Sequence, residues 1–191
     1  METNIRPFDI YPRCPTVCSG LVELHPLRIE DVSQRYVDWL NDPEVNRTLA
    51  SQELARIESV RAYVQVKTER PDIWFWKIIH TQDNVHVGNL KLDPISFAGA
   101  YAWYGILIGD KRYWGKGLAT EATRLALSAA FTVGKLNRIF LGVYAENSAA
   151  LSVYDKCGFE IMSTHPDGRA VDPGVVYMKA VVGNVATTVS T

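Results

Sequence analysis

Long apolar runs are absent from this sequence of 191 residues, and cysteine is scarce. No stretch approaches the roughly 18 apolar residues of a membrane-spanning helix, and the amino terminus lacks the apolar core of a signal peptide. We therefore expect a cytoplasmic protein. The three cysteines, Cys14, Cys18 and Cys157, form no disulfide framework, and the first two lack the second pair that a zinc site needs. Free thiols and no metal site are predicted.

An excess of either charge is also lacking, since the formal net charge is −1 at pH 7. Nucleic acid and anionic membranes are therefore not expected as partners, and any anionic ligand must be held by local geometry. What the chain does contain is an ordinary 47% of hydrophobic residues, enough for one domain with a sizeable core.

Three segments differ in pattern. Residues 1–20 carry three prolines and no clear periodicity, which predicts an irregular N-terminal arm. Residues 183–191 are small and polar, which predicts a flexible tail. The folded domain is expected over residues 21–182, and apolar spacing places its elements. Helices are predicted over 31–40, 59–68, 118–133 and 148–156, and strands over 21–24, 73–79, 85–92, 101–108, 138–144, 159–162 and 175–182.

The segment 114–122, with the sequence WGKGLATEA, is a glycine-rich turn between a strand and a helix. A helix start offers unpaired N–H groups and a partial positive charge, so this turn predicts an anion site. It is not a mononucleotide P-loop, because Gly117 follows Lys116 and the spacing from Gly109 is wrong. Nor is it a dinucleotide fingerprint, because Thr120 occupies the position of the third glycine.

A second pattern lies downstream, where Asn147 precedes a short helix that contains Tyr154 and is followed by Gly158-Phe159. Together the two patterns resemble the GCN5-related N-acetyltransferase (GNAT) superfamily, whose pyrophosphate signature is Gln/Arg-x-x-Gly-x-Gly/Ala. Trp114 departs from that signature at its first position. The resemblance implies an α/β (α+β) fold with a mixed, mainly antiparallel sheet of about seven strands and about four flanking helices. It further implies acetyl-CoA as co-substrate and no metal.

The resemblance also implies roles for individual residues. Main-chain groups of Leu107 and Ile108 would pair with the pantetheine arm, Asn147 would hydrogen-bond it, and Tyr154 would protonate the leaving thiolate. The pyrophosphate would be held by the amides of Gly115, Lys116, Gly117, Leu118, Ala119 and Thr120. Other interpretations stay open: Asn147 could organise the helix entry, and Tyr154 could pack as an ordinary buried aromatic. Lys111 is equally compatible with a coenzyme contact and with a solvated turn.

The acceptor side is less determined. Trp103 and Tyr104 could line the acceptor cleft or belong to the core, and Asn41 and Asn46 lie in a polar loop between the first two helices. That loop resembles a stretch of sugar-nucleotide N-acetyltransferases, whereas the glycine turn resembles ribosomal-protein alanine acetyltransferases. The general base is not identified; chemistry alone allows Glu23, His86, Asp110 or Glu146.

We therefore expect an N-acetyltransferase for an amino-sugar nucleotide or another small amine. Acetylation of a protein amino terminus is the alternative enzyme function. A non-catalytic acetyl-CoA sensor and a structural domain with an empty turn are the alternatives that involve no reaction. The carboxy-terminal strands could pair between the subunits of a homodimer.

Overall fold

The computed structural model describes residues 11–47 and 53–184. Its strands are β1 (Val17–Cys18), β2 (Val22–Pro26), β3 (Trp74–His80), β4 (Val85–Ser96), β5 (Tyr101–Ile108), β6 (Arg138–Tyr144), β7 (Glu160–Ile161) and β8 (Val175–Val181). Its α-helices are α1 (Gln34–Asn41), α2 (Pro43–Asn46), α3 (Ile57–Thr68), α4 (Leu118–Thr132) and α5 (Ser148–Lys156), and two short 3-10 turns are η1 (Ile29–Asp31) and η2 (Lys111–Tyr113). In the described part of the chain, no helix is long and apolar enough to cross a bilayer.

The strands form one sheet in the order β1-β2-β3-β4-β5-β6-β8-β7. Among the described residues only β5 and β6 pair in parallel, which confirms the predicted mixed, mainly antiparallel sheet. The sheet has one strand more than predicted, because Val17–Cys18 of the expected irregular arm pairs with β2. Of the predicted tail, residues 185–191 lie outside the described part.

Five helices replace the expected four. α1 ends at Asn41, one residue beyond the predicted end, and Asp42 then caps a new one-turn helix through a 2.9 Å hydrogen bond from the Glu44 amide. Proline suits the first position of a helix, so Asn41-Asp42-Pro43 stops one helix and starts another.

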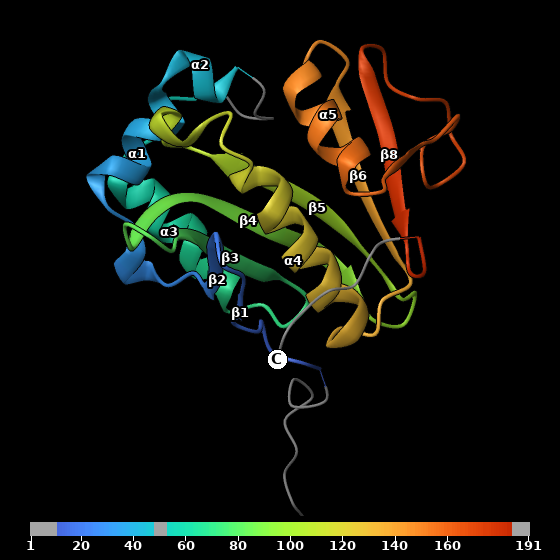
Figure 1. The fold of residues 1–191 in the computed structure, drawn as a ribbon, viewed down its shortest axis with the longest axis horizontal. Helices are drawn as coiled ribbons and strands as arrows, with labels where there is room; N and C mark the ends of the chain where they lie inside the picture. Colours follow the sequence, from blue (N-terminus) through green and yellow to red (C-terminus); the bar gives the residue numbers. More distant parts are fainter. Residues whose placement is uncertain (1–10, 48–52, 185–191) are drawn as a thin grey trace, which may run out of the picture.

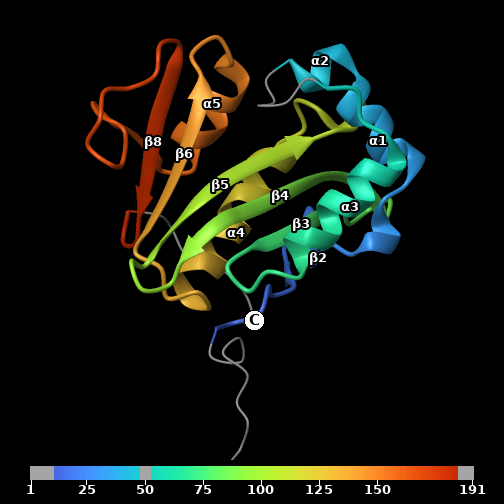
Figure 2. The ribbon, with the colours of Figure 1, turned by 180° about the vertical axis from the view of Figure 1, so that it is seen from behind.

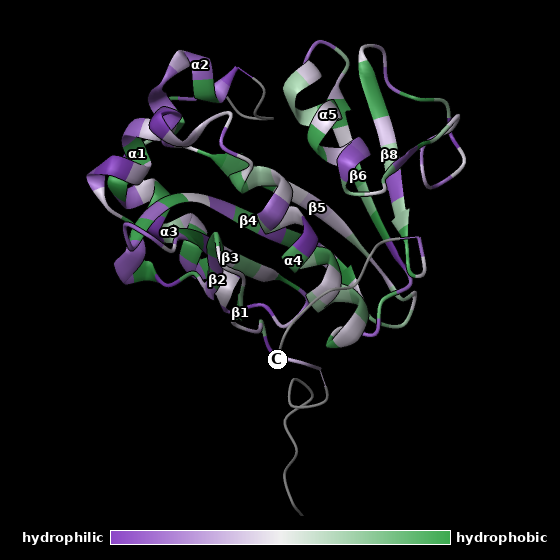
Figure 3. Cartoon of the chain, viewed as in Figure 1, coloured by the Kyte–Doolittle hydropathy of each residue, from purple (hydrophilic) through white to green (hydrophobic). Residues whose placement is uncertain are grey.

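The core divides between the two faces of the sheet. On one face α4 and α5 lie over the strands (Figure 1), and α4 contributes most of its residues to the larger apolar cluster. On the other face α1 and α3 pack against β3 and β4 around a smaller cluster (Figure 2). Figure 3 shows the hydrophobic positions of α4 and the central strands alternating with hydrophilic ones. The predicted α4 stripe is buried from Leu118 to Ala129, whereas Val133 lies beyond the last helical residue and is 41% exposed.

Residues 11–20 lie against the sheet. The indole N–H groups of Trp74 and Trp76 donate to the carbonyls of Pro12 (3.0 Å) and Pro15 (2.6 Å). A buried indole needs a hydrogen-bond acceptor, and here the arm supplies both of them.

The feature that positions the site is the divergence of β5 from β6. The two strands pair at only three positions, Tyr101 with Arg138, Ala102 with Ile139 and Trp103 with Phe140. Beyond these positions they separate into a V, which is visible in Figures 1 and 2. We call this opening the splay; it leaves the carboxyl half of β5 without a ladder partner on the β6 side.

Candidate active site

The glycine turn ends in two left-handed residues. Gly115 has φ +70° and Gly117, the N-cap of α4, has φ +82°. A Cβ at either position would meet nothing within 4 Å, so glycine is required by the backbone conformation and the space above the turn is open. The first backbone bond of α4 runs from the Glu121 amide to the Gly117 carbonyl (3.0 Å). The amides of Leu118, Ala119 and Thr120 thus have no partner within the helix, and this donor set fits a pyrophosphate.

The two lysines of the turn differ in their surroundings. Lys111 Nζ forms ion pairs with Asp42 Oδ2 (2.7 Å) and Glu44 Oε2 (2.5 Å), so it fastens the turn to the start of α2. Lys116 Nζ lies 5.3 Å from the centre of the Tyr113 ring and forms no ion pair within the described ranges, although its charge helps to lower the pKa of Asp83. Of the two lysines, Lys116 is therefore the better placed to face an anionic ligand.

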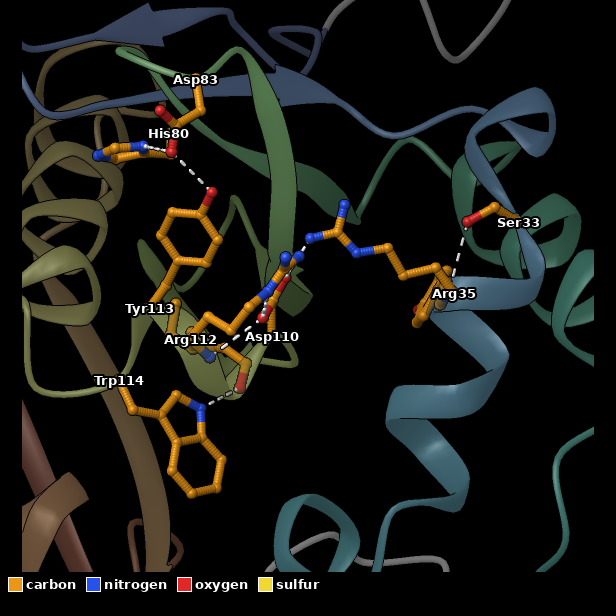
Figure 4. A network of polar contacts seen from close by, with 10 residues as sticks. Ser33, Arg35, His80, Asp83, Asp110, Arg112, Tyr113 and Trp114 are labelled. Atoms are coloured by element: carbon orange, nitrogen blue, oxygen red, sulfur yellow. Dashed lines mark hydrogen bonds and ion pairs between the residues drawn. The ribbon is translucent and has the colours of Figure 1, made fainter.

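A polar network holds the turn in place (Figure 4). The buried Asp110 carboxylate accepts from Arg112 Nη2 (2.8 Å) and Nε (3.0 Å) and from Arg35. These bonds, led by those from Arg112, hold the pKa of Asp110 well below its usual range. On the other side the Tyr113 hydroxyl donates to Asp83 Oδ2 (2.7 Å), which also lies 3.0 Å from His80 Nδ1.

Trp114, the residue that departs from the family signature, closes the turn onto β5. Its indole N–H donates to the Ile108 carbonyl (2.7 Å), while 43% of the residue stays exposed (Figure 4). The side chain thus fixes the end of the strand that borders the splay. Leu107 and Ile108 are paired with Asn89 and Gly88 of β4 on their other side.

The side of the splay opposite β5 is formed by β6 and by α5, which follows it in the chain. Asn147 caps α5, since its Oδ1 accepts from the Ala150 amide (3.1 Å). Its Nδ2 has no partner among the described residues. The two interpretations of Asn147 are therefore compatible, because one side-chain atom organises the helix and the other can still donate to a ligand.

Two buried tyrosines, Tyr104 of β5 and Tyr154 of α5, lie together in the larger apolar cluster. The ring centres of Tyr104 and Tyr154 are 5.9 Å apart, and the Phe159 ring packs against both. The Tyr104 hydroxyl is 2.7 Å from Thr123 Oγ1, whose proton is given to the Ala119 carbonyl, so Tyr104 is the donor. The Tyr154 hydroxyl has no partner in the described part of the chain. Burial raises the pKa of Tyr154 to about 12, which keeps it a neutral hydrogen-bond donor at physiological pH.

Tyr104 and Trp103 point to opposite faces of β5, because successive side chains of a strand alternate. Tyr104 belongs to the core beneath α4, which is the alternative that the sequence left open. Trp103 is half-buried on the other face, beside Phe140 and His165. Trp103 also lines a cavity on that face.

The polar loop residues are engaged with the backbone. The Asn41 side chain donates to the Ala55 carbonyl (2.9 Å) and accepts from the Ala55 amide (2.8 Å). Asn46 Nδ2 donates to the Leu40 carbonyl (3.1 Å). Both amides therefore brace the segment around α2, and we do not carry them into the proposed acceptor site.

The candidate bases are not brought together. Asp110 is held as an ion pair, and Glu23 lies on β2, which is separated from β5 by two strands, and is paired with His25 (2.6 Å). Burial lowers the pKa of His86, whose Nε2 lies 2.9 Å from the Gly88 carbonyl and 3.0 Å from Asn89 Oδ1. Glu146 is exposed at the mouth of the splay, just before Asn147.

Sequence reasoning missed two groups on the acceptor side. Asn89 is 5% exposed, and its Nδ2 has no hydrogen-bond partner in the described part of the chain. Arg138 and Phe140 of β6 and His165 of the loop before β8 approach Trp103, so three segments of the chain meet there. No motif marks any of these residues. Within the described residues no cluster of three His, Cys, Asp or Glu side chains is placed to hold a metal.

A left-handed glycine turn at a helix start, beside two splayed parallel strands, offers amide donors for a phosphate and a strand edge without a partner for an extended ligand. Residues 22–160 match the family model described as an acetyltransferase (GNAT) domain, and the chain therefore belongs to this family of N-acetyltransferases, which use acetyl-CoA. The chain is 34% identical over 150 residues to spermidine N(1)-acetyltransferase of Escherichia coli K12, with 73% of each chain covered.

Solved structures confirm the fold. A spermidine N-acetyltransferase from Vibrio cholerae in complex with CoA and spermine has a TM-score of 0.73 at 19% identity, over 85% of this chain and 96% of that one. A ribosomal-protein alpha-N-acetyltransferase, RimL, in complex with coenzyme A has a TM-score of 0.75 at 16% identity, over 89% and 99% of the two chains. These structures share the fold of this chain, and the family model makes the chain an N-acetyltransferase of the GNAT family.

Proposed function

We propose that this enzyme acetylates a small primary amine, presented to acetyl-CoA within the splay between β5 and β6. The observation that carries the proposal is a set of polar donors without protein partners on the elements that border this opening. They are the first amides of α4, the Asn147 Nδ2 and the Tyr154 hydroxyl, which have no partner within the described ranges. Unpaired donors around one opening favour a ligand that pairs with them.

The residues take the following roles in this proposal. The amides from Gly115 to Thr120 hold the pyrophosphate, and Lys116 adds a positive charge beside it. Main-chain groups of Leu107 and Ile108 pair with the pantetheine arm, and Asn147 Nδ2 donates to it. The amine nitrogen then bonds to the thioester carbonyl carbon as the carbon–sulfur bond breaks. The Tyr154 hydroxyl gives its proton to the departing thiolate and regains one from solvent, and the ammonium formed on attack loses one proton to solvent.

Two acceptor classes have support. An amino-sugar nucleotide is suggested by the likeness of the loop around Asn41 and Asn46 to sugar-nucleotide N-acetyltransferases. A polyamine is favoured by the 34% identity to spermidine N(1)-acetyltransferase. The Asn41 side chain and Asn46 Nδ2 are engaged with the backbone, which weakens the support for an amino sugar.

Calorimetry with acetyl-CoA, followed by thiol release with spermidine, an amino-sugar nucleotide and a ribosomal-protein amino-terminal peptide, tests this proposal. We expect coenzyme binding and faster turnover with one small amine than with the peptide. Binding without turnover on any amine would indicate a sensor. The absence of coenzyme binding would reject the proposal altogether.

A further inference from the structure

Gly105 lies inside β5, and nothing in the fold requires a glycine there. Its φ is not positive, and among the described residues a Cβ on Gly105 would meet only the Lys91 side chain, at an ordinary 3.9 Å. Gly88 of β4 differs, because a Cβ there would lie 2.1 Å from the Leu107 carbonyl oxygen. A glycine weakens a strand, and close approach of a ligand is a common reason for one. We therefore look for a ligand beside Gly105.

Gly105 is the first position on its face of β5 after β5 and β6 part. The last pair of the two strands is Trp103 with Phe140, whose rings approach each other (6.0 Å) on the face away from α4. Because side chains alternate, the next position on this face is Gly105 on β5 and Gly142 on β6. The splay, which Figure 2 shows from this face, thus begins with two positions that carry no side chain. We call the space between Gly105 and Gly142 the gap.

The side chains beside the gap present apolar atoms to it. Lys91 lies opposite Gly105 on β4 and pairs its Nζ with Asp93 (3.0 Å), so the atoms nearest to Gly105 are carbons of its stem. On the other side, the Tyr177 ring would lie 3.1 Å from a Cβ on Gly142. Apolar surroundings favour the uncharged form of an amine, which is the form that attacks a thioester.

The cavity beside Trp103, of about 330 Å³, gives room for the rest of an acceptor. Its charges balance: Asp167 pairs with Arg169 (3.4 Å), which also pairs with Asp172 (2.7 Å), and Arg138 supplies the second positive charge. The cavity therefore does not select an acceptor by the sign of its charge. The width of the gap is left as the selecting feature.

We propose that the acceptor amine reaches the thioester through the gap, and that Gly105 sets how bulky the carbon bearing the amine can be. The inference rests on the proposed function, in which the pantetheine arm runs from the glycine turn along Leu107 and Ile108. Its thioester then lies towards the closed end of the splay, beside Gly105. An amine on a CH₂ group needs little width, whereas two missing side chains leave room for an amine on a ring or branched carbon. That is the acceptor class.

The first test locates the coenzyme sulfur. Gly105→Cys places a thiol in the gap, and coenzyme A disulfide is the probe: the introduced thiolate attacks one sulfur, a mixed disulfide forms, and one coenzyme A leaves as a thiol. Ala62→Cys, at an exposed position of α3, is the control, and wild type gives the background of the exposed Cys18. By mass spectrometry, we expect Gly105→Cys to react about tenfold faster than the control or more, because binding positions the sulfur. Acetyl-CoA should suppress the reaction.

The second test measures selection by bulk. Gly105→Ala adds one carbon that the fold accommodates, so stability and acetyl-CoA affinity should not change. Its kcat/KM for an amino-sugar nucleotide and for an amino-terminal peptide, whose amines lie on ring and branched carbons, should fall by roughly ten- to a hundredfold. The loss for spermidine, whose amines lie on CH₂ groups, should be several-fold smaller. Gly20→Ala, where a Cβ meets nothing within 4 Å, should leave all three values unchanged.

The outcomes separate this inference from the proposed function. If Gly105→Cys reacts no faster than Ala62→Cys while acetyl-CoA still binds, the gap is not beside the sulfur and only the inference fails. Equal losses of kcat/KM for spermidine and the bulkier amines in Gly105→Ala would show that Gly105 does not select by bulk. Turnover of spermidine alone would also overturn the inference. Absent acetyl-CoA binding, or no turnover with any of the three amines, would remove the proposed function itself.

Discussion

The proposed catalytic role of Tyr154 can be tested with the neighbouring buried Tyr104 as a control. Tyr154→Phe removes a hydroxyl that makes no hydrogen bond within the described ranges, and the ring keeps its contacts with Tyr104 and Phe159. Tyr104→Phe removes a hydroxyl that donates to Thr123 Oγ1. The two substitutions delete the same atom from rings 5.9 Å apart, so they form a matched pair.

We expect Tyr154→Phe to lower turnover but not stability, and Tyr104→Phe to lower stability but not turnover. Tyr154→Phe breaks no internal bond, so its unfolding free energy should stay within about 0.5 kcal/mol of the wild type. Its turnover should fall by about a hundredfold, or ~2.7 kcal/mol of transition-state stabilisation, the lower end for a lost acid. Tyr104→Phe should lose about 1 kcal/mol of stability, because a buried hydrogen bond disappears. Its turnover should change little.

Thiol release with a saturating amine gives the turnover, calorimetry gives the affinity for acetyl-CoA, and denaturant unfolding gives the stability. Acetyl-CoA affinity should be nearly unchanged in Tyr154→Phe, since the hydroxyl acts on the departing sulfur. Because the pKa of Tyr154 is about 12, the wild-type rate should show no loss from its ionisation below about pH 11. Equal turnover in wild type and Tyr154→Phe would refute the role. A stability loss matching that of Tyr104→Phe would show that the hydroxyl is structural.

Three further variants test the coenzyme side. Gly117→Ala forces alanine to a φ of +82°, which should lower the free energy of unfolding by about 1–2 kcal/mol. The same variant should bind acetyl-CoA more weakly in calorimetry. Gly183→Ala, at φ +99° and far from the turn, is the control and should lose stability without losing affinity. Trp114→Phe removes the donor to the Ile108 carbonyl and should raise the Kd for acetyl-CoA with little change in kcat; an unchanged Kd would deny that Trp114 positions the strand. Asp110→Asn tests the turn network in acid. Because the pKa of Asp110 is lower in the folded protein than the unfolded value of about 3.9, its ionised form stabilises the fold at pH values above about 4. This stabilisation is lost as the pH falls towards the folded pKa. The difference in unfolding free energy between wild type and Asp110→Asn should therefore shrink below about pH 4, by up to ~1.4 kcal/mol per pH unit. A difference that does not change with pH would contradict the ion pairing of Asp110.

The central elements could be predicted from the sequence because their signals are local. The small-residue stripe of α4 and the β-branched and aromatic runs of the strands follow from periodicity alone. β1 could not be predicted, because two residues without a pattern become a strand only by meeting β2. α2 was missed for a different reason: Asp42-Pro43 was interpreted only as a stop, although the same pair is a favourable helix start.

The coenzyme side of the site follows a single continuous stretch, so its backbone geometry could be anticipated. What could not be anticipated is which side chains are already engaged. Lys111 looked available for a phosphate, yet it pairs with Glu44, which is 67 residues away in sequence. Asn41 looked suited to a sugar, yet it clamps Ala55. In both cases long-range contacts decide which polar side chains are left for a ligand.

The acceptor side escapes sequence reasoning for a deeper reason. The cavity beside Trp103 is assembled from three segments, around residues 101–103, 138–140 and 165–167, and none of them carries a motif. Its charged groups pair within one loop: Asp167 lies 3.4 Å from Arg169, which also pairs with Asp172 at 2.7 Å. These groups meet the strands only once the loop before β8 folds back onto β5. The loop is separate from the glycine turn, so a change confined to it leaves the residues of the proposed coenzyme site as they are.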